Sequence, residues 1–344
     1  MVRPFVFVCL LLACSVWGQS TNDEKDPDRM LIVLGPPSVH DPYYQDKFDQ
    51  MVTFYLRYVS KVKGRDNVVL VADPDTMPHF KGKLPEDMLL TVSLEDPWVR
   101  DPSPAIPSMS VQFVYTGGVS KDQAQRTQDA FNKFIDKYGV QKTQADFILD
   151  GGNLVDNNLD AAIVTDRLLE DNDYDKTDPA AVQQAKDDFM QATGLSALAI
   201  IPADEPKLAH ADGMVSFITE DTVLVNEYDE PFRTQVLNEL KQLDVNVVEV
   251  PNNPSDVTYK GGFSSACGVY VNTVVTPKHV YMPIFNDPMD KKAQDAFQAQ
   301  AGDKEVVPID TREVCVMGGS LRCLSWQVQG ENAKKIIQAA RNEP

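Results

Sequence analysis

The feature that most constrains the fold is a pattern in which two short β-rich runs precede an acidic amphipathic helix. This pattern recurs about five times along the chain, which is typical of α/β folds. The runs are rich in β-branched and aromatic residues and end at turn-forming residues. They cover residues 30–34, 68–72, 88–92, 111–115, 161–165, 198–201, 215–218, 222–225, 245–250, 269–275 and 280–282. The sequence therefore predicts an α/β chain built from a repeated unit.

The helices are predicted from apolar residues that recur three and four positions apart. Phe131, Phe134 and Ile135 follow this spacing, and Ser120 with Gln123 predicts a capping box ahead of them. The other predicted helices cover residues 43–61, 179–193, 231–243, 290–300 and 331–341.

The N-terminal residues predict an export signal. Residues 1–18 place Arg3 before an apolar run over 5–12 and then small residues, which is the order found in signal peptides. A polar segment over 19–28 follows, and 29–341 contain no linker, so we expect one catalytic domain. No later segment reaches the roughly 18 consecutive apolar residues of a membrane helix. We therefore expect a secreted, extracellular protein that does not enter a membrane.

The charge balance disfavours several classes of partner. The chain carries 51 acidic residues against 32 Lys and Arg, a formal net charge of −19. Such a surface repels nucleic acid and anionic lipid and attracts cations. The aspartates of 171–178 are spaced like a calcium loop, but Lys176 replaces the required glycine and Val182 the closing glutamate. We expect a solvated loop there, no metal and no cofactor.

The cysteine count makes one thiol a candidate nucleophile. After signal removal Cys267, Cys315 and Cys323 remain, and an odd number leaves at least one thiol without an intramolecular partner. A free cysteine is either a nucleophile or a buried, inert thiol. The count leaves open which of these applies and whether Cys267 pairs with Cys315.

Five polar segments interrupt the periodic pattern, and each alone has an ordinary explanation as a turn or a strand. They are WVRD at 98–101, DGGN at 150–153, HAD at 210–212, NTVVTPKHVYMP at 272–283 and GGSLRC at 318–323. Together and in this order, the five segments resemble the guanidine-modifying superfamily, in particular the bacterial-type peptidylarginine deiminase and agmatine deiminase family. The resemblance covers nearly the whole mature chain and implies a five-bladed, pseudo-symmetric α/β propeller, the pentein fold.

The resemblance also implies the reacting residues. Cys323 matches the nucleophile, and His210 matches the acid and base that protonates ammonia and then activates water. Asp101 and Asp212 match two carboxylates that grip the substrate. This assignment suits a guanidinium because its N–H pairs donate bidentate hydrogen bonds to carboxylates, and a thiolate can attack its delocalised carbon.

Four further residues are implied to bind or orient. Trp98 either stacks on the guanidinium or packs the loop, and Asp96 belongs to the same charged segment. Asp150 is expected to orient His210. Asn272, predicted to lie in a strand, occupies a cleft position of the family, although a structural hydrogen bond to a neighbouring loop explains it equally well.

The sequence departs from the family at three places. Asp150 replaces the Glu of the agmatine enzymes, and Arg322 replaces the His that normally precedes the nucleophile. The segment after Tyr115 lacks the paired arginines that hold a C-terminal carboxylate, since Lys121 and Arg126 are its nearest cations. We therefore expect internal arginines to be accepted at least as well as C-terminal ones.

These observations predict a secreted hydrolase that converts arginine in peptides or proteins to citrulline and ammonia through a thiouronium intermediate. Two alternatives stay open: an agmatine or free-arginine deiminase, and a non-catalytic pentein-fold binding protein or toxin. Arg322 is the main sequence argument for lost turnover, because a fixed cation could repel the substrate. The same cation could instead lower the pKa of the thiol and favour turnover. The oligomeric state is not predicted.

Overall fold

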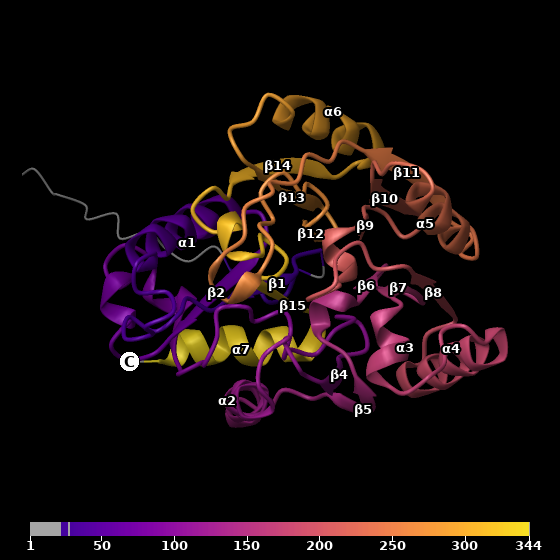
Figure 1. Ribbon diagram of the computed structural model, residues 1–344. Coiled ribbons are helices and arrows are strands. Elements are labelled where there is room, and N and C mark those ends of the chain that lie inside the picture. The colour runs from indigo at the N-terminus through magenta and orange to yellow at the C-terminus, as the bar shows by residue number, and fades with distance from the viewer. Residues whose placement is uncertain (1–21, 27, 344) are drawn as a thin grey trace, which may run out of the picture.

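The computed structural model describes residues 22–26 and 28–343, which form five small β-sheets with helices on the outside (Figure 1). The predicted signal peptide lies outside the described residues. The strands are β1 Leu31–Leu34, β2 Asn67–Ala72, β3 Leu89–Thr91, β4 Val111–Val114, β5 Thr143–Ile148, β6 Val155–Asp156, β7 Ala161–Thr165, β8 Ala197–Ile201, β9 Val215–Phe217, β10 Thr222–Asn226, β11 Asn246–Val250, β12 Val274–Val275, β13 His279–Ile284, β14 Glu305–Asp310 and β15 Ser325–Val328.

The α-helices are α1 Phe48–Val62, α2 Lys121–Lys137, α3 Arg167–Asp171, α4 Pro179–Thr193, α5 Phe232–Leu240, α6 Asp290–Gln300 and α7 Gly330–Asn342. The Ser120 side chain caps α2 by accepting a hydrogen bond from the backbone N–H of Gln123 (3.3 Å). Six one-turn 3-10 helices lie in the described loops. Asp150 directly precedes Gly151–Asn153, and Asp212 lies within Ala211–Gly213.

One strand arrangement recurs in four of the sheets. In the sheet β6-β7-β8, the first strand is antiparallel to the second and the second is parallel to the third. The sheets β9-β10-β11, β12-β13-β14 and β15-β1-β2-β3 begin in the same way, and β4-β5 is a parallel pair. In each of the five sheets, the chain between two neighbouring parallel strands contains at least one helix. The predicted α/β class is confirmed. No sheet closes on itself within the described ranges, and the propeller arrangement stays a prediction.

The first sheet shows how alternating side chains build the core. Ile32 and Leu34 pack with α1 on one face, whereas Leu31 and Val33 pack with α2 and α7 on the other. Because both faces are covered, all four residues of β1 are buried. Residues of all five polar segments meet at or beside one cavity.

Several expectations about local structure were wrong. Residues 269–273 form a turn and not a strand, so Asn272 lies in a loop before β12. His210 and Asp212 lie at a 3-10 turn directly before β9, and the strand predicted over 215–218 begins only after them. The strands β5, β6, β14 and β15 and the helix α3 were not predicted, because their short, partly polar sequences carry a weak periodic signal.

Cys267 and Cys315 form a disulfide, which answers the pairing question that the sequence left open. Cys323 is the free cysteine of the described residues. No helix in this part of the chain is long and apolar enough to cross a membrane.

Candidate active site

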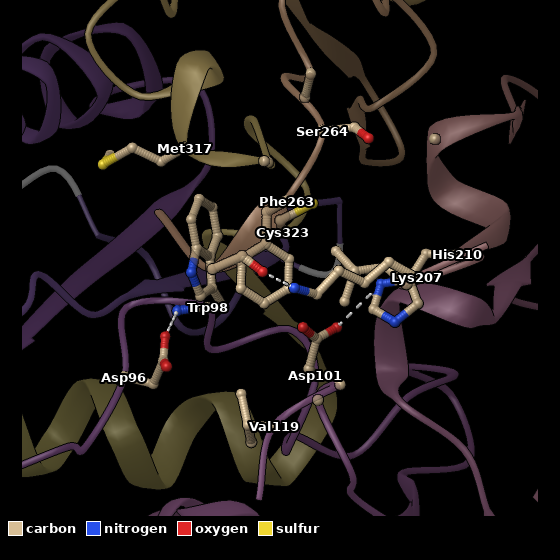
Figure 2. A pocket seen from close by; sticks show the side chains of 18 of the residues that line it. Asp96, Trp98, Asp101, Val119, Lys207, His210, Phe263, Ser264, Met317 and Cys323 are labelled. Atoms are coloured by element: carbon tan, nitrogen blue, oxygen red, sulfur yellow. Dashed lines mark hydrogen bonds and ion pairs between the residues drawn. The ribbon is translucent and has the colours of Figure 1, made fainter. Parts of the chain in front are cut away.

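A cavity of about 590 Å³ brings most of the predicted site residues together (Figure 2). Trp98, Asp101, His210, Asp212 and Cys323 all line it, although they come from loops far apart in the sequence. Asp96 and Asn272 line it as well, whereas Asp150 lies behind His210. The carboxylates in the lining are Asp41, Glu95, Asp96, Asp101, Asp204, Glu205 and Asp212. This composition favours a cationic ligand.

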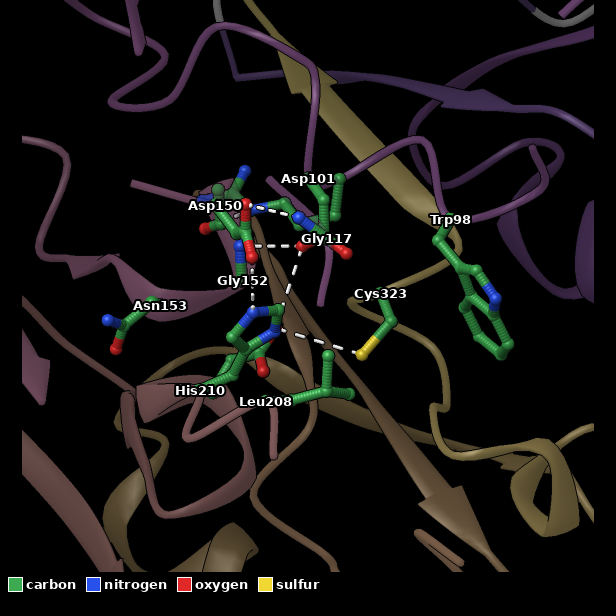
Figure 3. Close-up of polar contacts among 12 residues, drawn as sticks. Trp98, Asp101, Gly117, Asp150, Gly152, Asn153, Leu208, His210 and Cys323 are labelled. Atoms are coloured by element: carbon green, nitrogen blue, oxygen red, sulfur yellow. Dashed lines mark hydrogen bonds and ion pairs between the residues drawn. The ribbon is translucent and has the colours of Figure 1, made fainter. Parts of the chain in front are cut away.

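His210 is held between two carboxylates (Figure 3). Its Nε2 lies 3.2 Å from Asp150 Oδ2, and its Nδ1 lies 3.8 Å from Asp101 Oδ1. Asp150 is fixed in turn, because its Oδ1 accepts hydrogen bonds from the backbone N–H groups of Thr116 (2.7 Å) and Gly117 (2.9 Å). The imidazole therefore has one orientation, in which it faces Cys323.

Glycine is required where the DGGN turn meets the histidine. A Cβ on Gly152 would lie 2.5 Å from His210 Nδ1 and 2.7 Å from Asp101 Oδ1, closer than a side chain can approach. The backbone N–H of Gly152 instead donates a 2.9 Å hydrogen bond to Asp101 Oδ1. The glycine thus lets the turn approach both side chains and hold Asp101 in place.

The nucleophile loop is fixed by an amide side chain. Asn272 Nδ2 lies 3.2 Å from Cys323 Sγ, and Asn272 Oδ1 accepts a 3.0 Å hydrogen bond from the backbone N–H of Arg322. Cys323 Sγ also lies 3.8 Å from Asp212 Oδ2. A Cβ on Gly319 would lie 2.5 Å from the Trp98 ring, so this glycine lets the indole sit beside the thiol.

Arg322 is turned away from the main cavity. Its guanidinium pairs with Asp212 Oδ2 (3.2 Å) and donates a 2.7 Å hydrogen bond to the carbonyl of Leu154. It lines a second, smaller cavity of about 270 Å³, which also exposes Asp156. Arg322 pairs with Asp212 and does not line the main cavity. It therefore does not obstruct a guanidinium that enters this cavity.

Burial and mutual charge set the protonation states. Burial raises the pKa of Cys323 well above its usual value, and the charges of Asp212 and Asp101 raise it further. Burial raises the pKa of Asp101 to about 6 against the effect of His210. Burial opposes charge on His210, but Asp101 and a hydrogen bond to Asp150 raise its pKa to about 9. At neutral pH the site therefore holds a thiol, an imidazolium and an ionised Asp101.

The wall around Trp98 contains one weakly acidic carboxyl. Asp96 Oδ1 accepts a 3.0 Å hydrogen bond from the Trp98 backbone N–H and lies 3.4 Å from the Tyr44 hydroxyl. Burial raises the pKa of Asp96 to about 7, although the hydrogen bond from Trp98 opposes the shift, and nearby Asp101 and Asp41 raise it further. Asp96 thus supports the Trp98 turn and adds negative charge to the cavity as pH rises.

The structure adds residues that the sequence did not single out. Arg167 Nη1 lies 3.4 Å from Asp150 Oδ2, and Arg167 Nη2 donates to Thr116 Oγ1 (3.0 Å), so it supports the carboxylate behind His210. Arg167 lies two residues after the end of β7. This position could have indicated a functional role from the sequence, because polar residues in loops after strands often belong to binding or catalytic sites. Lys207 and Phe263 line the cavity mouth. Lys207 lies three residues before His210, but nothing in the sequence pairs it with Phe263.

Comparison with protein families gives a match over most of the chain. The model of the family described as Porphyromonas-type peptidyl-arginine deiminase matches residues 21–328. A curated relative, "Putative agmatine deiminase" of Vibrio parahaemolyticus, is 21% identical over 281 residues, which cover 70% of this chain and 77% of the relative. An agmatine deiminase of Pseudomonas savastanoi is 38% identical, but over only 60 residues, 17% of this chain and 16% of that protein.

Solved structures share the fold. The agmatine deiminase of C. jejuni superposes with a TM-score of 0.72 at 19% identity, covering 90% of this chain and 96% of that one. The agmatine deiminase of Enterococcus faecalis gives a TM-score of 0.68 at 17% identity, with 90% and 95% covered. A structure of DDAH from Pseudomonas aeruginosa in complex with citrulline has a lower TM-score, 0.51, at 13% identity over 86% and 98% of the two chains.

Proposed function

The chain belongs to the Porphyromonas-type peptidyl-arginine deiminase family, and from this premise we propose that it deiminates a small guanidinium cation of the agmatine type. The observation that carries this proposal is the pair formed by a free thiol and a buried imidazole in a cavity lined by seven carboxylates. Members of the family hydrolyse a C–N bond of an amidine. Agmatine carries a second positive charge. The carboxylates that line the cavity in addition to Asp101 and Asp212 favour that charge.

The grip on the guanidinium comes from Asp101 and Asp212. Both carboxylates line the cavity beside Cys323, and each can accept a pair of N–H groups from a planar cation. Asp212 is held by Arg322, and Asp101 by the backbone N–H of Gly152. Because both are fixed before the substrate arrives, little orientation entropy is lost on binding.

The substrate's own charge prepares the nucleophile. Asp101 and Asp212 hold the pKa of Cys323 high while the cavity is empty, and a bound guanidinium offsets both charges. The thiol then loses its proton to solvent, and the thiolate attacks the guanidinium carbon to form a C–S bond. His210 gives a proton to the leaving nitrogen, and the C–N bond breaks with release of ammonia.

The second half of the reaction removes the thiouronium. His210, now neutral, takes a proton from water, and the resulting hydroxide adds to the same carbon. The C–S bond breaks, the hydroxyl proton of the collapsing adduct passes to the Cys323 thiolate, and the product is a urea in place of the guanidine. Asp150 keeps the imidazole in the orientation that both proton transfers need.

A second candidate substrate is arginine within a peptide. The cavity of about 590 Å³ is within the range of clefts that bury ligands much larger than agmatine. Export also supports this candidate, because agmatine is mainly intracellular. We propose export on two grounds, the signal-like pattern of residues 1–18 and the Cys267–Cys315 disulfide, a bond common in oxidising compartments.

The repeated sheets support a five-bladed propeller, which we also propose, as the overall arrangement.

One experiment tests the function and ranks the substrates. Ammonia release is measured in parallel from agmatine, free arginine and a peptide with an internal arginine, for the wild-type protein and Cys323→Ala. We expect agmatine to give the highest kcat/KM and the variant to give none. Turnover of the peptide alone would replace agmatine by the second candidate, and no turnover of any guanidine would leave the non-catalytic binding protein.

A further inference from the structure

The mouth of the cavity holds an ammonium group of the protein itself. Lys207 Nζ lies 3.9 Å from the centre of the Phe263 ring and donates a hydrogen bond to the carbonyl of Gly261. All three residues line the same cavity as Cys323 and Asp101 (Figure 2). An aromatic face together with a carbonyl oxygen is a suitable environment for a cation. The mouth therefore contains a formed cation site whose present occupant is Lys207.

Phe263 and Gly261 are fixed independently of Lys207. Lys260, on the same segment, pairs with Asp46 Oδ1 (2.5 Å) and donates to the carbonyl of Tyr43 (2.8 Å). The Tyr43 hydroxyl donates in return to the carbonyl of Lys260 (2.6 Å). At the other end of the segment, the disulfide from Cys267 ties the chain to Cys315. Removing the Lys207 ammonium therefore leaves the aromatic face and the carbonyl in place.

We propose that the Phe263 face and the Gly261 carbonyl form the subsite for the second cation of a diaminobutane-like guanidine substrate, and that Lys207 occupies this subsite until the substrate displaces it. The proposal rests on the proposed function, since it assumes that the guanidinium binds beside Cys323. Lys207 is then a specificity-determining residue. It competes with a substrate ammonium but not with an uncharged alkyl end.

The charge of the cavity supports displacement over repulsion. Asp204 and Glu205 also line the cavity and precede Lys207 in the same loop, so the released ammonium has carboxylates close to its own backbone. The Lys207 stem carries four methylene groups, as many as separate the two cationic ends of agmatine. A lysine is therefore of the right length and charge to imitate the distal end of this substrate.

The test compares agmatine with n-butylguanidine, which has the same guanidinium and chain but no ammonium. Lys207→Met removes the competitor, and we expect the KM for agmatine to fall about fivefold, the scale of a partly exposed charge contact, while the KM for n-butylguanidine changes little. Phe263→Leu keeps the bulk but removes the aromatic face, so the KM for agmatine should rise severalfold relative to n-butylguanidine.

Lys241→Met is the control, because it removes an exposed lysine charge that lies outside the cavity lining and outside the segment that carries Phe263. It should leave the ratio of the two KM values unchanged. Equal shifts for both compounds in Lys207→Met, or the same ratio change in Lys241→Met, would overturn the subsite. If wild-type protein deiminates neither compound, the proposed function fails separately. Calorimetry with 1,4-diaminobutane then decides the subsite, and equal affinity for wild-type protein and Lys207→Met overturns it.

Discussion

Arg322 forms an ion pair with Asp212, with 3.2 Å between Nη1 and Oδ2, and the pair separates two cavities of the molecule. Asp212 lines the larger cavity with Cys323, and Arg322 lines the smaller one. Both side chains are buried, so neither charge is satisfied by solvent. The unusual residue before the nucleophile therefore acts on the substrate through Asp212.

Replacing Arg322 tests this relationship. Arg322→Met leaves Asp212 as a buried charge without its partner, so we expect at least about a tenfold loss of kcat/KM and a lower Tm. Arg322→Lys keeps the charge but cannot contact Asp212 and Leu154 at the same time as the guanidinium does. Its kcat/KM and Tm should therefore lie between those of the wild-type protein and Arg322→Met. The test measures kcat/KM and Tm for the wild-type protein, Arg322→Met and Arg322→Lys. A gain in kcat/KM for Arg322→Met would mean that the cation repels substrate.

Cys323→Ala should abolish turnover with little change in Tm, because the reaction needs a sulfur nucleophile while the fold does not. The control is the double variant Cys267→Ser with Cys315→Ser, which removes the disulfide. It should lose about 2 to 4 kcal/mol of stability but keep turnover when folded. Ammonia release and thermal unfolding separate the two effects. Activity retained without Cys323 would remove it from the mechanism.

The two gripping carboxylates should respond differently to neutralisation. Asp101→Asn and Asp212→Asn each remove a charged contact to the guanidinium, a loss of about 2 to 4 kcal/mol in transition-state stabilisation. Only Asp212→Asn also removes the shorter ion pair of the buried Arg322 cation, which then keeps only Asp156 at 3.9 Å, so only it should lower the Tm substantially. Measuring kcat/KM and Tm for both variants checks this. Near wild-type activity in either one excludes that residue from the grip.

The pH dependence of kcat/KM should be bell-shaped. Asp101 must be ionised to grip the cation, and its pKa is raised to about 6, so activity falls as the pH drops through that value. His210 must carry a proton for ammonia to leave, and its pKa is raised to about 9, so activity falls above that pH. Initial rates between pH 5 and about 10 measure both limbs. Asp101→Asn should remove the acidic limb, and an unchanged limb would assign it to another group.

The position of arginine within a peptide gives a further prediction. Neither Lys121 nor Arg126 lines the cavity, and the ammonium of Lys207 is engaged by Gly261 and Phe263. We therefore expect peptides with an internal or amidated arginine to be modified at least as well as a peptide ending in free arginine. Citrulline formation from matched peptides tests this. A strong preference for the free carboxylate would show that Lys207 leaves its subsite to bind it.

The sequence by itself determined the class of the fold and predicted most of the residues that line the candidate site. Strand and helix periodicity depend on neighbours within one segment, so elements such as α4 could be predicted with both ends correct. The order of the WVRD, DGGN, HAD and GGSLRC segments identified the family before any contact was known. Local pattern also showed that Cys323 would be one of an odd number of thiols.

Only the tertiary structure decided how the charges pair. Whether Arg322 faces the substrate or Asp212 depends on two loops 110 residues apart, and no periodicity records that choice. The same is true of Lys207, which reaches Gly261 across the cavity mouth, 54 residues along the chain. Such contacts follow from the packing of whole sheets against one another. Because a charge acts over distance in space and not along the sequence, its partner becomes known only when the loops have been placed.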